Sequence, residues 1–421
     1  MRLKNLNIKK INLKEIDKNY SGQDILMKLG ELYQYESGIY GYGNIWTKLE
    51  RKVEDIIIDE LDKVGCIQVE FPKLQPKKVW DQSNRWDVYT KENDIMFNFQ
   101  NNLGEYGLAP TAEECATIFG SNRLLSHKNL PAIYYQIGEK FRKEIRTRGY
   151  LFRPRTFVMM DAYSFDKNEE EMNKTYNLMH QAYLNIFDRV GIKIIPTVSD
   201  NGTMGGSIAE EFQAITDLGE DIVLYDEKNN IGINKEVLSF ENKEEYLKQI
   251  GAHELDQMKE YRSVEIGNNF QLGTKYSESM NLYYIDENGN KAPYYMGCYG
   301  IGIGRVIATI IENNLIKEND QIKGFSLPIN IAPYKIQIIY KEDKKEIAEK
   351  LYNDLNEKNI KCIIDDREDY SLGSKIKDTY TLGTPYIAII GNKFDGKTLE
   401  IEETKSGQKF NIEIDKIETL F

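Results

Sequence analysis

Five arginines gather in one short stretch of a chain whose formal net charge is −12. They stand at Arg142, Arg146, Arg148, Arg153 and Arg155. A guanidinium group is planar and permanently charged, and it can bind two oxygens of a phosphate or carboxylate at once. The cluster therefore predicts a binding site for a polyanion, and a solvated basic loop is the alternative.

A second pattern with chemical meaning is the alternation of glycine and isoleucine over residues 300–304, which Arg305 follows. Alternating glycines leave one face of a strand bare, so a flat ring can lie against the backbone and the arginine can reach a phosphate. Dinucleotide-binding loops look similar, but they need an acidic residue about 20 positions later, and Glu312 comes too soon. We expect a nucleotide-binding strand and an apolar helix that Arg305 opens.

A third candidate group is Thr111 with Glu113 and Glu114, directly after Pro110. These residue types suit the first turn of a helix, where they cap the backbone and complement the dipole. The functional alternative is that they face a cleft, where Glu113 meets the positively charged amine of a substrate.

The arginines need a scaffold that presents them together. Apolar residues at 132–137 and 157–160 have the pattern of buried strands, and Gly149 and Pro154 mark a turn between them. The pattern predicts a β-hairpin whose loop carries the arginines.

Hydrophobic periodicity predicts further helices and strands on both sides of this hairpin. They are a helix over residues 44–64, a strand over 67–71, a helix over 169–190 and strands over 192–198 and 222–225. Asp166 and Glu169 have the spacing of a capping box before the second helix. Residues 199–212 are glycine-rich, which indicates either turns or a backbone that closes over a small ligand. Residues 226–257 indicate mixed helix and loop.

Beyond residue 324 the pattern changes to strands and helices in alternation, which predicts a separate α/β domain with a largely parallel sheet. The expected order is strand 336–340, helix 342–359, strand 362–365, helix 373–382, strand 386–390 and a closing hairpin from 396. Asp366, Arg367 and Lys375 gather at the carboxyl end of the second strand, where open α/β sheets usually bind ligands. Solvated loop charges are the alternative.

Composition excludes several classes of protein. The chain has 421 residues, of which 41% are hydrophobic and 29% charged, so two or three domains with full cores are expected and no segment is apolar enough to cross a membrane. Four dispersed cysteines without a Cys-x-x-Cys pair argue against structural zinc, and three isolated histidines argue against hydrolases built on histidine. Chemistry by positioning and charge is favoured, and a cytoplasmic location is expected, with an organelle as the alternative.

Together, the motifs resemble those of class II aminoacyl-tRNA synthetases, and in particular prolyl-tRNA synthetases of the bacterial and organellar type. The segments that carry the resemblance are LAPTAEE (108–114), the hairpin ending in MDAYSFD (160–166), NGTMGGS (201–207), LGTKYSE (272–278), MGCYGIGIGR (296–305) and LPINIAP (327–333). Residues 44–76, 141–161 and 296–312 resemble the first, second and third signature motifs of the class.

The resemblance implies an α+β catalytic domain over residues 1–323, with an antiparallel sheet flanked by helices, and a smaller α/β anticodon-binding domain over 324–421. It implies a homodimer, in which the first motif forms the interface. It also implies that proline and ATP form prolyl-adenylate with bound Mg²⁺, and that the prolyl group then passes to tRNA(Pro).

The resemblance also assigns roles to individual residues. Around the nucleotide they are Arg142 at the α-phosphate, Glu144, which orients the nucleotide, Phe157 against adenine, Arg153 and Arg305 at the γ-phosphate, and Gly302 in the ATP-binding strand. Around proline they are Thr111, Glu113, Arg142, Tyr163, Glu211 and Cys298, with Glu113 taking the ammonium. Arg142, Glu144 and Arg305 would be catalytic; Asp366, Arg367 and Lys375 would contact the anticodon, and no residue would be a dedicated metal ligand.

The chain departs from the family in three places. Ala209 and Glu210 stand where Ser-His is usual, so a histidine that closes the amino-acid pocket is missing. Thr156 and Met160 replace a usual glutamate and lysine, and only 75 residues separate Glu220 from Met296, too few for an inserted editing domain. Another class II synthetase, such as a zinc-dependent threonyl enzyme, and a non-catalytic paralogue that binds RNA or protein are the alternatives.

Overall fold

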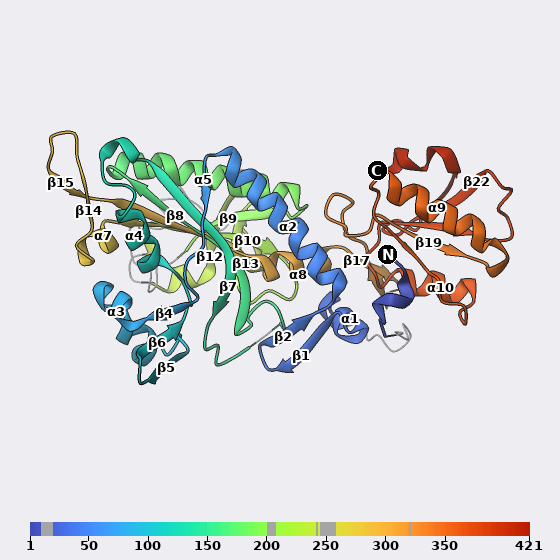
Figure 1. Cartoon of the computed structure of the whole chain (residues 1–421), viewed down its shortest axis with the longest axis horizontal. Coiled ribbons are helices and arrows are strands. Elements are labelled where there is room, and N and C mark those ends of the chain that lie inside the picture. Colours follow the sequence, from blue (N-terminus) through green and yellow to red (C-terminus); the bar gives the residue numbers. More distant parts are fainter. Residues whose placement is uncertain (10–19, 148, 200–207, 241–242, 245–257, 320) are drawn as a thin grey trace. The chain divides into compact units, whose positions relative to one another are not determined.

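The computed structural model describes residues 1–9, 20–147, 149–199, 208–240, 243–244, 258–319 and 321–421 (Figure 1). Contacts divide the chain into two compact units. One, the sheet unit, consists of Ser37–Ile39 and Glu54–Val306, and the other, the tail unit, consists of Met1–Glu36, Tyr40–Val53 and Ile307–Phe421. Across the described residues, no helix combines the length and the apolar character that a membrane span needs.

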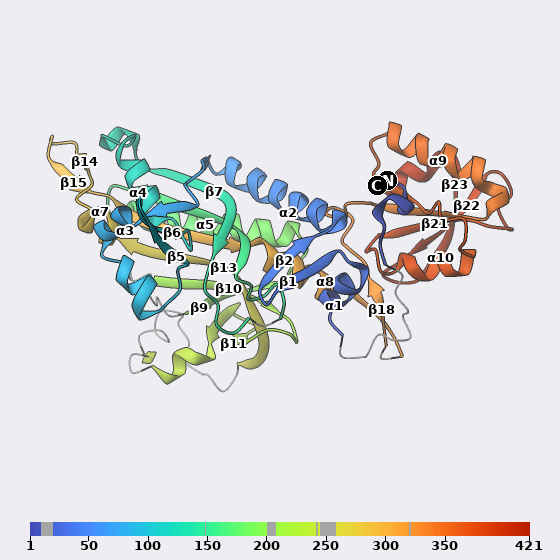
Figure 2. The ribbon, with the colours of Figure 1, turned by 60° about the horizontal axis from the view of Figure 1, so that its bottom comes forward.

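The sheet unit is built on nine strands in the order β10-β9-β12-β11-β13-β16-β8-β7-β3, and β10 also pairs with β13 (Figure 2). Only the β12–β9 and β3–β7 pairings are parallel among the described strands of this sheet, so the predicted antiparallel sheet is confirmed. The strands are β3 (Ile67–Gln68), β7 (Ala132–Phe141), β8 (Thr156–Asp166), β9 (Ile194–Val198), β10 (Ile208–Ile215), β11 (Asp221–Asp226), β12 (Ile231–Asn234), β13 (Lys259–Gly273) and β16 (Tyr295–Gly302).

Helices cover both faces of this sheet because successive strand residues point to opposite sides. The helix α5 (Glu169–Arg189) packs against β8, β13 and β16, with Tyr183 and Phe187 meeting Phe212 of β10. The carboxyl half of α2 (Asn44–Lys63) lies beside α5, where Arg189 pairs with Glu60. On the opposite face, α4 (Glu113–Ser121) and α7 (Lys275–Ser279) enclose an apolar core with Tyr163.

The hairpin of β7 and β8 is longer than its apolar residues indicated. Its register runs from Phe141 opposite Thr156 to Ala132 opposite Phe165. Polar positions inside it look like loop in the sequence, but Lys140 and Asp161 are buried and pair with each other at 2.6 Å. The loop that this hairpin presents carries the arginine cluster, as predicted.

Several local expectations were wrong. The strand expected over residues 67–71 is only β3, and the side chain of Ile67 is exposed. Asn168, whose side-chain oxygen accepts from the Glu171 amide, caps α5, whereas Asp166 ends β8. The helix α8 (Ile303–Asn313) begins two residues before Arg305.

Residues 226–257 include β12 and the turn η6 (Lys235–Ser239), and residues 241–242 and 245–257 lie outside the described part of the chain, as does NGTMGGS. The smaller elements of the sheet unit surround these strands. They are β4 (Leu74–Pro76), α3 (Lys77–Trp80), η3 (Asp81–Ser83), the π-helical turn η4 (Val88–Glu92), β5 (Asn98–Asn101), β6 (Gly104–Leu108), η5 (His127–Asn129), β14 (Tyr283–Ile285) and β15 (Lys291–Pro293).

The tail unit contains the five-stranded sheet β20-β19-β21-β22-β23. Its first three strands are parallel and its last two form an antiparallel hairpin, which confirms the predicted α/β order. The elements are β19 (Ile336–Tyr340), η8 (Glu342–Lys344), α9 (Lys345–Glu357), β20 (Cys362–Ile364), α10 (Leu372–Thr379), β21 (Tyr386–Ile390), β22 (Thr398–Glu403), β23 (Lys409–Glu413) and η9 (Ile414–Leu420). The helices α9 and α10 cover opposite faces of it (Figure 1).

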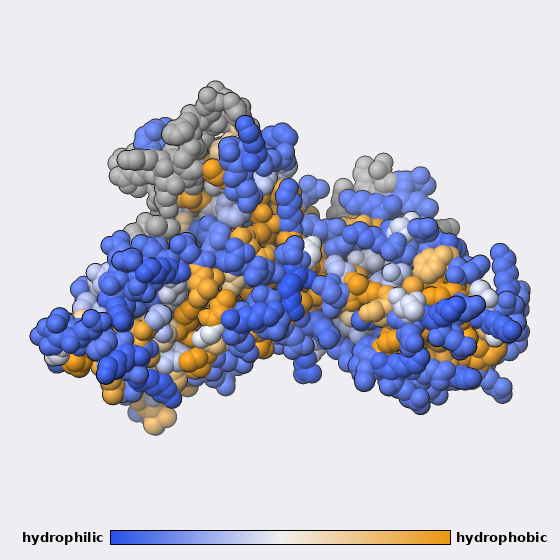
Figure 3. Space-filling view, turned by 90° about the horizontal axis from the view of Figure 1, so that it is seen from above, coloured by the Kyte–Doolittle hydropathy of each residue, from blue (hydrophilic) through white to orange (hydrophobic). Residues whose placement is uncertain are grey.

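The remaining described elements come from the start of the chain and from the segment before β19. They are η1 (Leu3–Leu6), α1 (Gly22–Leu29), β1 (Leu32–Glu36), β2 (Ile39–Tyr42), β17 (Leu315–Glu318) and β18 (Gln321–Phe325). Figure 3 shows a surface on which hydrophilic residues dominate and apolar residues form patches between them, in keeping with a mean hydropathy of −0.55.

Candidate functional site

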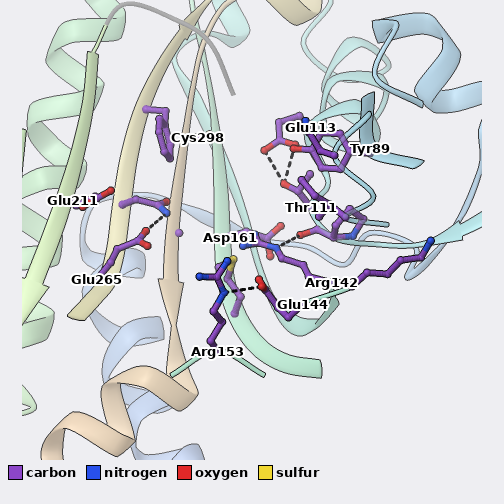
Figure 4. A pocket seen from close by; sticks show the side chains of 18 of the residues that line it. Tyr89, Thr111, Glu113, Arg142, Glu144, Arg153, Asp161, Glu211, Glu265 and Cys298 are labelled. Atoms are coloured by element: carbon purple, nitrogen blue, oxygen red, sulfur yellow. Dashed lines mark hydrogen bonds and ion pairs between the residues drawn. The ribbon is translucent and has the colours of Figure 1, made fainter. Parts of the chain in front are cut away.

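A cavity of about 810 Å³ opens in the sheet unit, between the sheet strands, the start of α4 and the arginine-rich loop (Figure 4). A smaller hollow beside it shares part of its wall, including Arg142, Glu265 and Gly300. Together they gather every site residue that the sequence placed in the catalytic domain. The larger cavity takes Thr111, Glu113, Arg142, Glu144, Arg153, Tyr163, Glu211 and Cys298, and the smaller hollow adds Phe157, Gly302 and Arg305.

The loop end of the cavity is rich in arginine, and Arg142 and Arg153 both have partners within the chain. Arg142 donates from Nε to the Pro110 carbonyl oxygen at 3.3 Å, and its guanidinium lies 5.2 Å from the centre of the Phe157 ring. Arg153 donates from Nε to Glu144 Oε2 at 2.7 Å, and this hydrogen bond raises the pKa of Arg153. These contacts hold the guanidinium groups beside the cavity. The carboxylates that touch them do not cancel all of their positive charge.

Arg305 is fixed by groups from two other segments. Its Nε donates to the Phe152 carbonyl oxygen at 2.7 Å, and its Nη1 donates to the Glu265 carbonyl oxygen at 2.8 Å and to Glu265 Oε2 at 3.0 Å. A Cβ built at Gly302 would lie 3.4 Å from the Arg305 side chain. A Cβ at this position would therefore touch the Arg305 side chain at ordinary van der Waals distance.

The opposite end of the cavity is acidic and buried. Figure 4 shows Thr111 and Glu113 on one wall and Glu211 across from them, whereas Glu265, which pairs with Arg305, belongs to the arginine-rich end. The Thr111 hydroxyl lies 2.7 and 2.8 Å from the two carboxylate oxygens of Glu113, and α4 has no side-chain cap. The interpretation of Thr111 as a helix cap is therefore wrong.

Asp161 connects these two ends. Its Oδ2 accepts from Gln136 Nε2 and from the Tyr163 hydroxyl, both at 2.8 Å, and its Oδ1 pairs with Lys140. The Tyr163 oxygen accepts in turn from the Ala112 amide at 3.0 Å. A buried ion pair with these additional hydrogen bonds holds the hairpin against the start of α4.

Burial raises the pKa of both Cys298 and Glu211 and so favours their protonated forms. Burial raises the pKa of the Cys298 thiol well above its ordinary value, so this sulfur is a poor nucleophile at neutral pH. Burial and the nearby charge of Glu265 raise the pKa of Glu211 to about 8, and Gln213 donates to its Oε2 at 2.7 Å.

The missing histidine at position 210 does not open the pocket wall. Strand alternation turns Glu210 away from Glu211 and toward α5, where its Oε2 lies 2.8 Å from His180 Nδ1. Glu211 lines the cavity and Glu210 does not. At position 210, the departure from the family pattern therefore lies on the face of the sheet that α5 covers.

The three residues expected to contact the anticodon lie together at the carboxyl end of β20, and each of them already has a partner within the chain. Arg367 donates two hydrogen bonds to Asp365 and one to Asp378. Lys375 is buried and donates to the Asp365 carbonyl oxygen at 2.9 Å, and Asp366 accepts from the Lys4 amide at 3.0 Å. Their contact with RNA stays a prediction.

Sequence reasoning missed residues in and behind the cavity wall. Glu265 and Asn268 line the cavity from β13. The charged residues of this strand hid its pattern, but the signal that could have revealed it is the alternation of Val264, Ile266, Phe270 and Leu272. Arg85 lies behind the cavity wall, and nothing in its local sequence marks it. Among the described residues, no group of three or more His, Cys, Asp or Glu side chains is placed to hold a metal ion.

Two family models match the chain. Residues 89–314 match the tRNA synthetase class II core domain (G, H, P, S and T), and residues 328–421 match the anticodon binding domain. The chain is 37% identical over 405 residues to the proline–tRNA ligase of Rickettsia bellii (strain OSU 85-389), covering 93% of this chain and 92% of that protein. It is 35% identical over 407 residues to the proline–tRNA ligase of Rickettsia akari (strain Hartford), covering 93% of each.

Solved structures with a similar fold include two of prolyl-tRNA synthetase from Cryptosporidium parvum. One is complexed with L-proline and AMP and has a TM-score of 0.73 at 16% identity, over 95% of this chain and 73% of that one. The other is complexed with halofuginone and AMPPNP and has a TM-score of 0.75 at 17% identity, over 95% and 75%. At these identities the likeness shows the fold.

Proposed function

Because the chain belongs to the proline–tRNA ligase family of class II tRNA synthetases, we propose that it joins L-proline to tRNA(Pro) at the expense of ATP. The observation that carries the proposal is one pair of adjoining hollows with a buried carboxylate at one end and three arginines at the other. That distribution suits a substrate with an ammonium group beside a polyphosphate.

In the first step, a carboxylate oxygen of proline attacks the α-phosphorus of ATP. The bond from this phosphorus to the oxygen that bridges to the β-phosphate breaks, and pyrophosphate leaves with that oxygen. Two anions must meet here, so Arg142 screens their charge while the cavity aligns the reacting atoms. Neither step needs a thiolate, and Cys298 serves as cavity wall.

ATP is held along the arginine-rich end. Arg142 meets the α-phosphate, Phe157 stacks on adenine beside the bare strand at Gly302, and Arg153 and Arg305 meet the γ-phosphate. Glu144 orients the nucleotide. The carboxylate oxygens of Glu144 and Glu265 beside these hollows are the hard donors that Mg²⁺ prefers, and the ion, when bound, would neutralise charge on the phosphates.

Proline occupies the buried end. Glu113 takes the secondary ammonium, and Thr111, Tyr163, Glu211 and Cys298 enclose the rest of the amino acid. In the second step, a hydroxyl of the terminal adenosine of tRNA(Pro) attacks the prolyl carbonyl carbon, the bond from that carbon to the phosphate oxygen breaks, and AMP leaves.

We also propose the assembly that the family pattern implies. Residues 1–323 act as the catalytic domain of a cytoplasmic homodimer joined through residues 44–76, and residues 324–421 act as the anticodon-binding domain. Asp366, Arg367 and Lys375 mark the edge at which the anticodon would be bound. The match of residues 328–421 to an anticodon binding domain supports this division.

ATP–pyrophosphate exchange with each amino acid in turn tests the function. Proline-dependent exchange by the purified chain is the expected result. Exchange that depends on another amino acid would support a different class II synthetase, and no exchange with any amino acid would support a non-catalytic paralogue.

We further propose that the chain does not hydrolyse alanyl-tRNA(Pro) in cis. The shortness of the segment between Glu220 and Met296 supports the proposal: the described part of residues 221–295 includes β11 to β15, η6 and α7, and three of these strands belong to the main sheet. A deacylation assay is expected to show no acceleration over buffer, and rapid release of alanine would contradict the proposal.

A further inference from the structure

Arg85 lies behind Glu113, enclosed by three aromatic rings. Its side chain is only 5% exposed, and its guanidinium carbon lies 5.3 Å from the ring centre of Trp80, 4.5 Å from that of Tyr89 and 5.2 Å from that of Tyr276. Its Nη2 donates to the Tyr89 hydroxyl. Cation–π contacts and this hydrogen bond fix the guanidinium before any ligand arrives.

One nitrogen of this fixed group holds two carboxylates. Arg85 Nη1 donates to Glu113 Oε2 and to Glu114 Oε1, both at 3.0 Å, and each carboxylate is 1% exposed. The Ser83 hydroxyl donates to Glu114 Oε1 at 2.6 Å, whereas Glu114 Oε2 has no hydrogen-bond partner among the described residues. The contacts therefore place two carboxylates on one guanidinium group. Burial raises the pKa of Glu114, and the positive charge of Arg85 opposes that shift.

Glu113 still has capacity to accept hydrogen bonds. An ionised carboxylate offers about four acceptor positions. Arg85 fills one, and the Thr111 hydroxyl has a single proton and fills one more. About two positions remain on a carboxylate that lines the cavity, and the secondary ammonium of proline donates two hydrogens.

The other cation near the cluster is Lys275 of α7. Its ammonium lies 5.6 Å from the centre of the Tyr276 ring, and burial, with the nearby Arg85, lowers its pKa. Arg85 contacts both carboxylates directly, and a cationic substrate would place a second positive group beside Glu113.

Resting on the proposed function, we infer that Arg85 and Glu114 are positioning residues of the proline slot. Arg85 orients Glu113 toward the cavity, and Glu114 takes up the positive charge of Arg85 so that Glu113 keeps its own charge for the substrate ammonium. Neither Arg85 nor Glu114 lines the cavity, so both act through Glu113.

Equilibrium binding to the full chain tests this with two ligands that differ only in the amine. L-proline carries the secondary ammonium, and tetrahydrofuran-2-carboxylate has the same ring and carboxylate with an uncharged oxygen in its place. Glu114→Gln keeps the shape of the side chain and removes one charge. We expect it to weaken proline by about tenfold, equivalent to one unit of pKa, and to leave the analogue within about twofold.

Arg85→Lys supplies a second, independent measurement. A lysine keeps the charge but cannot bond two carboxylates and Tyr89 from one planar group. In ATP–pyrophosphate exchange, we expect the KM for proline to rise about tenfold while kcat and the KM for ATP stay within about threefold. Arg123→Lys is the control, because Arg123 packs on the Phe119 ring and does not line the cavity.

Equal weakening of proline and its analogue by Glu114→Gln, or no weakening of either, would overturn the inference. So would an Arg85→Lys variant that lowers kcat with an unchanged KM for proline, since that result indicates a general structural role. If the wild-type chain neither binds proline nor supports exchange, the proposed function fails first and the inference fails with it.

Discussion

The two ends of the active-site cavity are built in opposite ways. At the amine end, Arg85 and Glu113 are 5% and 1% exposed and are already in contact. At the phosphate end, Arg153 and Arg305 are 47% and 31% exposed, and their partners include the carboxylates of Glu144 and Glu265 as well as carbonyl oxygens. The side chains of the amine end are buried and already paired with one another. The arginines of the phosphate end are partly exposed to solvent and are held in place by their partners.

This difference suits the role that we propose for each end. Discrimination of a small amino acid depends on a few buried polar groups, since a group left unpaired in a dry site is costly. A polyphosphate carries several charges and must leave as pyrophosphate, so solvent-accessible arginines with replaceable partners suit it better. The comparison predicts that substitutions at each end affect different kinetic constants.

The largest effect is expected at Arg142, where the two ends meet. Arg142→Ala removes the cation that screens the attack of one anion on another, and kcat for exchange should fall by about 10²–10³, the effect of losing one preorganised donor. Arg123→Ala is the control, because Arg123 stacks on Phe119 outside the cavity. A fall in kcat of less than fivefold would show that Arg142 does not take part in the catalytic step.

A second substitution addresses the amine end alone. Glu113→Gln leaves Arg85 paired with Glu114 and deprives proline of its counter-charge, so the KM for proline should rise about 10²-fold, in the range for a broken buried charge pair. Steady-state exchange at varied proline and at varied ATP measures this. A comparable rise in the KM for ATP would mean that the two ends are not separable.

The phosphate end should respond more weakly to the loss of one partner. Glu265→Gln weakens one of the contacts of Arg305, which keeps its bonds to two carbonyl oxygens, so we expect the KM for ATP to rise about tenfold with the KM for proline unchanged. Glu260→Gln on the same strand is the control, since Glu260 pairs with Lys235 at the surface. An effect on proline alone would reverse the assignment of the two ends.

The smallest effect is expected on the face of the sheet that the cavity does not use. The hydrogen bond to Glu210 raises the pKa of His180 above 6.5, so this pair stabilises the fold below about pH 6.5 and loses its effect as the pH rises through the raised value. Calorimetry between pH 5.5 and 8.5 should show that His180→Gln lowers the free energy of unfolding by at most about 1 kcal/mol at low pH and by nothing at high pH. The KM for proline should not change.

Much of the site could be predicted from the sequence, because many of its chemical groups lie in short segments with recognisable local patterns. The hairpin that presents Arg142 and Arg153 and the glycine strand before Arg305 each depend on short-range patterns of turn, alternation and charge. Strand alternation also fixes Glu210 and Glu211 on opposite faces, once β10 is known to be a strand. The sequence did not predict β10 as a strand, because this segment directly follows a glycine-rich one.

The sequence by itself therefore determined the family, the fold class and those charged groups that lie in recognisable motifs, such as Glu113, Arg142 and Arg305, since these depend on residue types and their spacing. Only the tertiary structure decided which charges are neutralised by one another. Arg85 and Glu113 are far apart along the chain, as are Glu265 and Arg305, and each pair meets because separate elements pack around one sheet. Partner choice among buried charges is set by that packing, which no local pattern records.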